Sequence, residues 1–153
     1  MPLADRLPTA ESDLRVVAAR LPLEDQRVLV VDDDELAREA LRAVLTAEGA
    51  EVTTADSAAE ALRALDLALP NVMLVDLAMP VVDGFTFVEQ IRMRSSEPVG
   101  RLPIAALTGY LSAEDRARAY RAGVQAYLLK PVDAGELIET IKTLASGRTC
   151  EPA

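Results

Sequence analysis

The chain of 153 residues contains no histidine and a single cysteine, Cys150. Without histidine, Ser-His-Asp triads, histidine general bases and histidine metal ligands are all excluded. One cysteine cannot form a disulfide within the chain, so we expect a reducing, cytoplasmic setting. Any metal or acid–base chemistry must therefore come from carboxylates.

Long apolar runs are also missing. Charged residues interrupt every run well before the roughly 20 residues that a membrane span needs, and the N-terminus lacks a signal-peptide pattern, so we expect no membrane insertion. Positive charge is scarce as well: the formal net charge is −9 and the pI is about 4.5. Such a surface disfavours direct nucleic-acid binding. We predict that an anionic ligand binds locally, through a cation.

From Arg27 onward, short β-branched runs alternate with longer segments of helical period. This alternation predicts βαβ units around a parallel sheet, an α/β fold with five strands. Continuous apolar runs predict that the first, third and fourth strands are central, whereas strand 51–54 is expected to be half exposed. The expected strands are 27–31, 51–54, 71–75, 104–107 and 126–129.

Cap residues mark several helix ends. Asp34, Ser57 and Ser112 are predicted to be N-caps, and Gly49 and Gly123 are predicted to end the first and fourth helices. The first of these helices should run from residue 35 to 48, with Arg38 exposed on it.

The chain divides into three parts. Residues 27–147 form one predicted domain, and residues 148–153 a flexible tail. Residues 1–26 do not fit the alternation; we expect a helical arm or linker there, because they carry one apolar stripe at helical spacing, Leu14, Val17, Ala18 and Leu21.

Polar residues follow the strands at the edge where parallel α/β sheets bind ligands. Asp32, Asp33 and Asp34 follow the first strand, Asp76 the third, Thr108 the fourth and Lys130 the fifth. Alone, each residue is an ordinary cap, turn or strand end. Clustered carboxylates repel one another unless a cation offsets them, and Mg²⁺ is the natural cation for oxygen ligands such as Asp33 and Asp76. Lys130, one of only two lysines, would supply a second positive charge.

Four motifs resemble the receiver domain of two-component response regulators, over about residues 27–147. The resemblance implies a flavodoxin-like (βα)5 fold, a doubly wound parallel five-stranded sheet with helices on both faces. It is similar both to stand-alone receivers and to the C-terminal receivers of hybrid sensor histidine kinases. The motifs are VLVVDD at 28–33, MLVDLAMPVVDG at 73–84, ALTG at 106–109 and LLKP at 128–131.

The resemblance implies a role for each residue of the metal site. Asp76 would be the phosphoacceptor and a metal ligand, and Asp33 a direct Mg²⁺ ligand. Asp32 would act on the metal largely through water, and the Ala78 carbonyl would be a further ligand. Lys130 would pair with the phosphoryl oxygens.

The resemblance also implies a switch. Thr108 would move toward the phosphoryl group, and the aromatic residue of the fifth strand, Tyr127, would move inward with it. The peptide bond between Lys130 and Pro131 would be cis, a form found mainly before proline.

By the same resemblance, the donor is a phosphohistidine on a histidine kinase or a histidine phosphotransfer protein. The domain would regulate rather than catalyse, supporting only its own phosphotransfer and dephosphorylation. With no room for an output domain after Gly147, we expect either signalling through contacts with an unknown downstream protein or a chain that is one piece of a longer protein. Apolar Ala78 and bulky Tyr110 predict slow dephosphorylation, because neither positions an attacking water well.

Two other interpretations remain open at this point. Asp32-x-Asp34 also matches the nucleophile motif of haloacid-dehalogenase-like phosphatases, with Asp32 attacking phosphate esters and Asp34 as acid–base, although Glu35-Leu36 lacks the usual hydroxyl residue. The other alternative is an interaction module with the same fold that is never phosphorylated.

Overall fold

A computed structural model describes residues 20–79, 82–94, 97–109 and 112–147. Its centre is a five-stranded parallel sheet with the order β2-β1-β3-β4-β5. The central strands are the three with continuous apolar runs, as predicted, and β2 lies at an edge with alternating exposure. The strands are β1 (Arg27–Val31), β2 (Glu51–Ala55), β3 (Val72–Asp76), β4 (Ile104–Thr108) and β5 (Ala126–Leu129).

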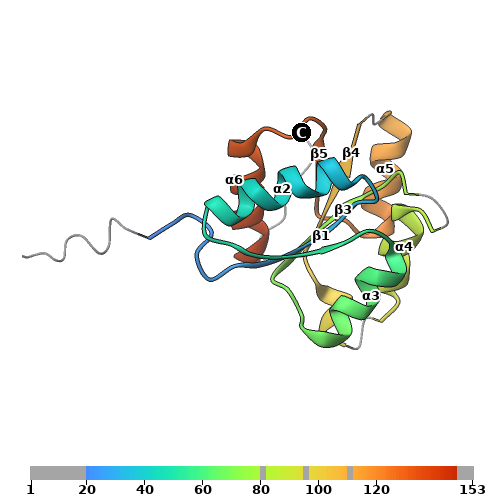
Figure 1. Cartoon of the computed structure of the whole chain (residues 1–153). Helices are drawn as coiled ribbons and strands as arrows, with labels where there is room; N and C mark the ends of the chain where they lie inside the picture. The colour runs from blue at the N-terminus through green and yellow to red at the C-terminus, as the bar shows by residue number, and fades with distance from the viewer. Residues whose placement is uncertain (1–19, 80–81, 95–96, 110–111, 148–153) are drawn as a thin grey trace, which may run out of the picture.

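Helices cover both faces of this sheet (Figure 1), which confirms the predicted doubly wound fold. Helices α2 and α6 pack on one face, and α3, α4 and α5 pack on the other. A short 3-10 helix before β4, η2 (Pro98–Arg101), was not predicted. The α-helices are α2 (Glu35–Ala47), α3 (Ala58–Leu67), α4 (Gly84–Arg92), α5 (Ala113–Ala122) and α6 (Ala134–Ala145).

The helix starts follow from side-chain caps. The three predicted N-caps, Asp34, Ser57 and Ser112, each accept a hydrogen bond from a backbone N–H in the first turn of their helix. Asp83 and Asp133 cap α4 and α6 in the same way, and these two caps were not predicted. The predicted helix ends are also confirmed: Gly49 and Gly123 have φ of 101° and 124°, a conformation that favours glycine.

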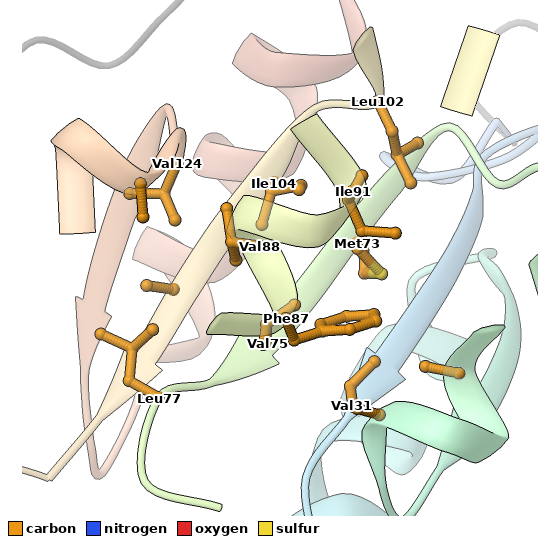
Figure 2. Close-up of a cluster of buried hydrophobic side chains, with 14 of the residues drawn as sticks. Val31, Met73, Val75, Leu77, Phe87, Val88, Ile91, Leu102, Ile104 and Val124 are labelled. Atoms are coloured by element: carbon orange, nitrogen blue, oxygen red, sulfur yellow. The ribbon is translucent and has the colours of Figure 1, made fainter. Parts of the chain in front are cut away.

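The core consists of two layers, one on each face of the sheet. Successive residues of β3 alternate between them: Met73 and Val75 face α3, α4 and α5, whereas Val72 and Leu74 face α2 and α6. In the first layer, Phe87 of α4 lies over β3 beside Val75 (Figure 2). Because residues on both faces of the central strands are buried, these strands are rigid supports for the loops that follow them.

Residues 20–26 lead into β1 and belong to the packed structure. Leu23 is fully buried in the layer under α2 and α6, and its N–H donates to the Glu48 carbonyl at 2.8 Å. Leu14, Val17 and Ala18 of the expected apolar stripe and the tail at 148–153 lie outside the described residues. Leu21, the last residue of that stripe, is exposed and lies outside any helix. Within the described ranges, every helix is too short or too polar to cross a bilayer.

Candidate functional site

The carboxyl ends of β1, β3 and β5 bring two carboxylates and an ammonium group together. Asp32 directly follows β1, Asp76 is the last residue of β3, and Lys130 directly follows β5. The Lys130 Nζ lies 2.8 Å from Asp32 Oδ2 and 3.6 Å from Asp76 Oδ2. Residues far apart in sequence thus meet at one edge because parallel strands end at the same edge.

Asp32 is fully buried, and each of its polar groups has a partner. Its N–H donates to the Ala55 carbonyl at 3.1 Å, and its Oδ1 accepts from the Asp34 N–H at 2.9 Å. Its Oδ2 accepts from Lys130, and its carbonyl accepts from the guanidinium of Arg38 at 2.9 Å. A buried charge requires such compensation. Asp32 is therefore a fixed element of the site.

Asp76 is 5% exposed and points its carboxylate at this cluster. Burial raises the pKa of Asp76 above its ordinary value, and the negative charge of Asp32 adds to this; the Ala78 N–H, donating to Oδ1 at 3.0 Å, and Lys130 act in the opposite direction. Burial also lowers the pKa of Lys130, but hydrogen bonds and attraction from both aspartates outweigh it and raise that pKa overall. Lys130 is thus held as a cation between two carboxylates.

Asp33 completes a cluster of three acids. One oxygen each of Asp32, Asp33 and Asp76 lies within 4.8 Å of the others, with Asp33 exposed and the other two buried. All three offer hard oxygen donors, and one side of the cluster faces solvent, where waters can fill the remaining positions that Mg²⁺ demands. The donor set fits that ion.

Residue 84, which follows Asp83 near this site, lies too close to the neighbouring backbone to carry a side chain. A Cβ at residue 84 would lie 2.4 Å from the Asp76 carbonyl oxygen and 2.5 Å from the Leu77 Cα. The Gly84 N–H also donates to the Leu77 carbonyl at 3.1 Å. The start of α4 therefore packs directly on the backbone beneath Asp76, and only glycine permits this approach.

The remaining predicted residues border the cluster. Thr108 ends β4, is 5% exposed, and its carbonyl accepts from the Lys130 N–H at 2.7 Å. Tyr127 of β5 is half-buried; its ring packs edge-on against Tyr120 at 6.1 Å, and Arg116 lies over it at 4.9 Å. The bond before Pro131 is cis.

The prediction of slow dephosphorylation rests on Ala78 and Tyr110. Ala78, two positions after Asp76, is exposed. Tyr110 lies outside the described residues.

The expectation that Arg38 is exposed was wrong: its side chain is partly buried because it reaches back to the Asp32 carbonyl. No motif marked Arg38, since an arginine in the first turn of a helix usually extends into solvent.

A family model, the response regulator receiver domain, matches residues 28–142. The chain belongs to this family. The family assignment agrees with the four motifs, with the strand order and with the acidic cluster at the carboxyl edge.

Relatives with known sequences support this receiver domain assignment. An uncharacterized 14.6 kDa protein from the sodA1 3' region of Leptolyngbya boryana is 46% identical over 78% of this chain and 90% of that protein. The transcriptional regulatory protein PrrA of Mycobacterium tuberculosis is 37% identical over 80% of this chain, but this match spans only 51% of PrrA. The DNA-binding transcriptional regulator NtrC of Escherichia coli is 35% identical, and the match spans 24% of it.

Solved structures give the same answer. The chemotaxis protein CheY4 of Vibrio cholerae is 33% identical, with a TM-score of 0.72 over 78% of this chain and 98% of that one. The receiver domain of the Francisella response regulator 1452 has a TM-score of 0.74 at 26% identity, over 80% of this chain and 98% of that one.

The receiver assignment settles the class of function: this is a regulatory domain of two-component signalling, a phosphorylation-dependent switch. Neither alternative is favoured. The site also argues against a dehalogenase-like nucleophile, because Lys130 and the Asp34 N–H already engage the two oxygens of Asp32. Asp34 itself caps α2 by accepting from the Leu36 N–H.

Proposed function

We propose that Asp76 is the phosphoacceptor of this receiver domain and takes its phosphoryl group from a phosphohistidine on a histidine kinase or phosphotransfer protein. The observation that carries the proposal is the position of Asp76 at the carboxyl edge, next to Lys130 and to the two other acids. Asp76 also differs from Asp32, because its Oδ2 has only the longer, 3.6 Å contact with Lys130.

In the proposed reaction, a carboxylate oxygen of Asp76 attacks phosphorus in line with the donor. The new P–O bond forms as the P–N bond breaks, and the electron pair and a proton from solvent go to the departing histidine. No general base is needed, because the carboxylate carries no proton to remove. Lys130 would neutralise charge on the phosphoryl oxygens.

Asp32, Asp33, Asp76 and the Ala78 carbonyl are the proposed holders of Mg²⁺. When bound, this ion would offset the charge that the transferred group brings to an already acidic edge. Asp33 is the exposed member of the three acids and would supply a ligand that water can accompany. Asp32, whose oxygens already have partners, would act mainly through a water.

The proposed output is a change in protein contacts. Thr108 would turn toward the phosphoryl group, and Tyr127 of the neighbouring strand would follow, changing the surface that an unknown downstream protein contacts. Thr108 pairs with Leu129 across β4 and β5. Tyr127 therefore lies on the strand next to Thr108, two positions before the residue that pairs with it. The domain would work in the cytoplasm and support only its own phosphotransfer and dephosphorylation.

Phosphotransfer profiling tests this proposal. Candidate histidine kinases are phosphorylated with labelled ATP and mixed with the domain and Mg²⁺, and label on the domain is followed with time. We expect transfer to wild type and to Asp66→Asn, an exposed acid on α3, but none to Asp76→Asn. Label that persists in Asp76→Asn would contradict the choice of acceptor.

The two lysines give a second matched pair. Lys130→Met should slow phosphorylation by acetyl phosphate by at least about tenfold, since it removes a charge beside the transferred group. Lys142→Met should leave the rate unchanged, because Lys142 is exposed and pairs on the surface with Glu139, at 3.8 Å. Equal rates in the two variants would remove Lys130 from the proposed mechanism.

A further inference from the structure

The segment Asp32-Asp33-Asp34 carries two of the proposed metal ligands, and Arg38 holds its backbone. The Arg38 Nη1 donates to the Asp32 carbonyl at 2.9 Å, six residues back along the chain. Arg38 itself lies in the first turn of α2, and its N–H donates to the Asp34 carbonyl at 2.9 Å. The side chain therefore links the first turn of α2 to the residue that directly follows β1.

The carbonyl that Arg38 holds belongs to the peptide unit between Asp32 and Asp33. Because a peptide unit is planar and moves as one body, holding its oxygen also restrains the N and Cα of Asp33. Asp33 is exposed, and within the described part of the chain we find no hydrogen bond to its carboxylate. The direction of the Asp33 side chain therefore depends on the backbone that Arg38 restrains.

We propose that Arg38 is a positioning residue for magnesium, which sets the orientation of Asp33 through the Asp32 carbonyl. The proposal rests on the function proposed for Asp33. Outer partners of this kind orient metal ligands, and their removal typically weakens metal affinity about tenfold or more.

Because Arg38 is positively charged, a positioning role and a purely electrostatic role predict opposite changes in Mg²⁺ affinity when it is removed. Hydrogen bonding with Glu60 is the main cause that lowers the pKa of Asp56, which directly follows β2, and the positive charge of Arg38 contributes to the same shift. Arg38 thus adds positive charge to the acidic edge. If it acted only through this charge, removing it would tighten Mg²⁺ binding, because one repelling cation is lost. A positioning role predicts the opposite.

The test is calorimetric titration of Mg²⁺ into the unphosphorylated protein, at one fixed ionic strength. We expect Arg38→Met to bind Mg²⁺ about tenfold more weakly than wild type. The matched control is Arg42→Met, which removes the same charge one turn further along the same helix; Arg42 is exposed and pairs only loosely with Glu39, at 3.7 Å. Its dissociation constant should stay within twofold of wild type.

A second control separates positioning from general loss of stability. Val44→Ala removes partly buried packing from the same helix and lowers stability, but it should leave the Mg²⁺ affinity unchanged. If Arg38→Met does not fold, Arg38→Lys takes its place, since lysine keeps the charge but not the guanidinium that reaches the carbonyl.

The outcomes are distinct. A dissociation constant for the Arg38 variant that is more than twofold weaker than wild type supports the proposal, and one within twofold or tighter overturns it. If wild type itself shows no Mg²⁺ binding, then the proposed metal site fails, and the role of Arg38 fails with it.

Discussion

The charged side chains that are buried or partly buried have different kinds of partner at the two ends of the sheet. Where β4 and β5 begin, the side chain of Arg92 donates to three neutral acceptors: the Gly123 carbonyl at 2.9 Å, the Gly100 carbonyl at 3.0 Å and the Gln125 Oε1 at 2.8 Å. The same Gln125 oxygen accepts from the Ile104 N–H at 2.8 Å. Burial lowers the pKa of Arg92, and each of its three side-chain nitrogens donates one hydrogen bond within the network.

At the other end, three carboxylates lie close together, and two of them, Asp32 and Asp76, pair with a single lysine. This end has a surplus of negative charge, which is unfavourable for the folded domain by itself but suits the arrival of a cation and a phosphoryl group. The contrast indicates that one end of the sheet is built for stability and the other for chemistry. Substitutions at either end test whether that division holds.

The largest effect is expected at the end built for stability. Arg92→Met should lower the free energy of unfolding by about 2–4 kcal/mol, because it leaves two backbone carbonyls and an amide oxygen without their charged donor. Urea denaturation followed by circular dichroism measures the change.

Arg94→Met is the matched control for this variant. The Arg94 side chain is 40% exposed and pairs with Glu97 at 3.0 Å on the surface, so its loss should cost less than about 0.5 kcal/mol. Similar losses for the two arginines would mean that the Arg92 network contributes little.

The carboxyl edge was more predictable from sequence than the opposite end. Asp32, Asp76, Thr108 and Lys130 each end or follow a strand, and the topology of a parallel sheet alone requires those positions to meet. Short-range rules likewise identified the caps Asp34, Ser57 and Ser112, because each cap bonds only to the helix that it starts.

Arg92 and Arg38 could not be predicted in the same way. Two partners of Arg92 are backbone carbonyls, 8 and 31 residues away along the chain, and a carbonyl carries no residue-type signal. The third partner is the Gln125 side chain, 33 residues away. An arginine in the last turn of a helix is ordinarily a solvated cation near the helix dipole. Its burial here depends on Gly123, where an added Cβ would lie 2.5 Å from the Arg92 Cγ. Only the packed structure reveals that dependence.

The second prediction concerns relief of the surplus charge by a cation. Mg²⁺ at ten times its dissociation constant should stabilise wild type by about 1.4 kcal/mol, because it binds only the folded state. Asp33→Asn should lose most of this gain, whereas Asp66→Asn on α3 should keep it. Thermal unfolding with and without Mg²⁺ provides the measurement, and an equal gain in Asp33→Asn would place the ion elsewhere.

The third prediction removes the surplus charge instead of offsetting it. Without Mg²⁺, Asp76→Asn should be more stable than wild type at neutral pH by on the order of 1 kcal/mol. The pKa of Asp76 is raised in the folded state, chiefly by burial, so the folded state binds its proton more tightly than the unfolded chain does. The charged form therefore destabilises wild type above the raised pKa, and this cost disappears below the unfolded value of about 3.9.

The gain from Asp76→Asn should accordingly shrink as the pH falls from neutral toward about 4. Denaturation of both proteins across this range measures it. Asp83→Asn is the matched control: it replaces an acid that caps α4, and asparagine caps nearly as well. A wild type that is as stable as Asp76→Asn at every pH would show that Lys130 already balances the site.

The smallest effect is expected in the lifetime of the phosphoryl group. Ala78 is exposed two residues after Asp76, and its N–H already donates to the Asp76 Oδ1. Because a methyl side chain cannot hold a water for attack, we expect decay over minutes or longer once the donor is removed. Ala78→Gln should speed the decay a few-fold, since its amide can bind that water, and Ala78→Val should not. Loss of label from phosphorylated protein gives the rates, and decay of wild type within seconds would show that the site orients water without residue 78.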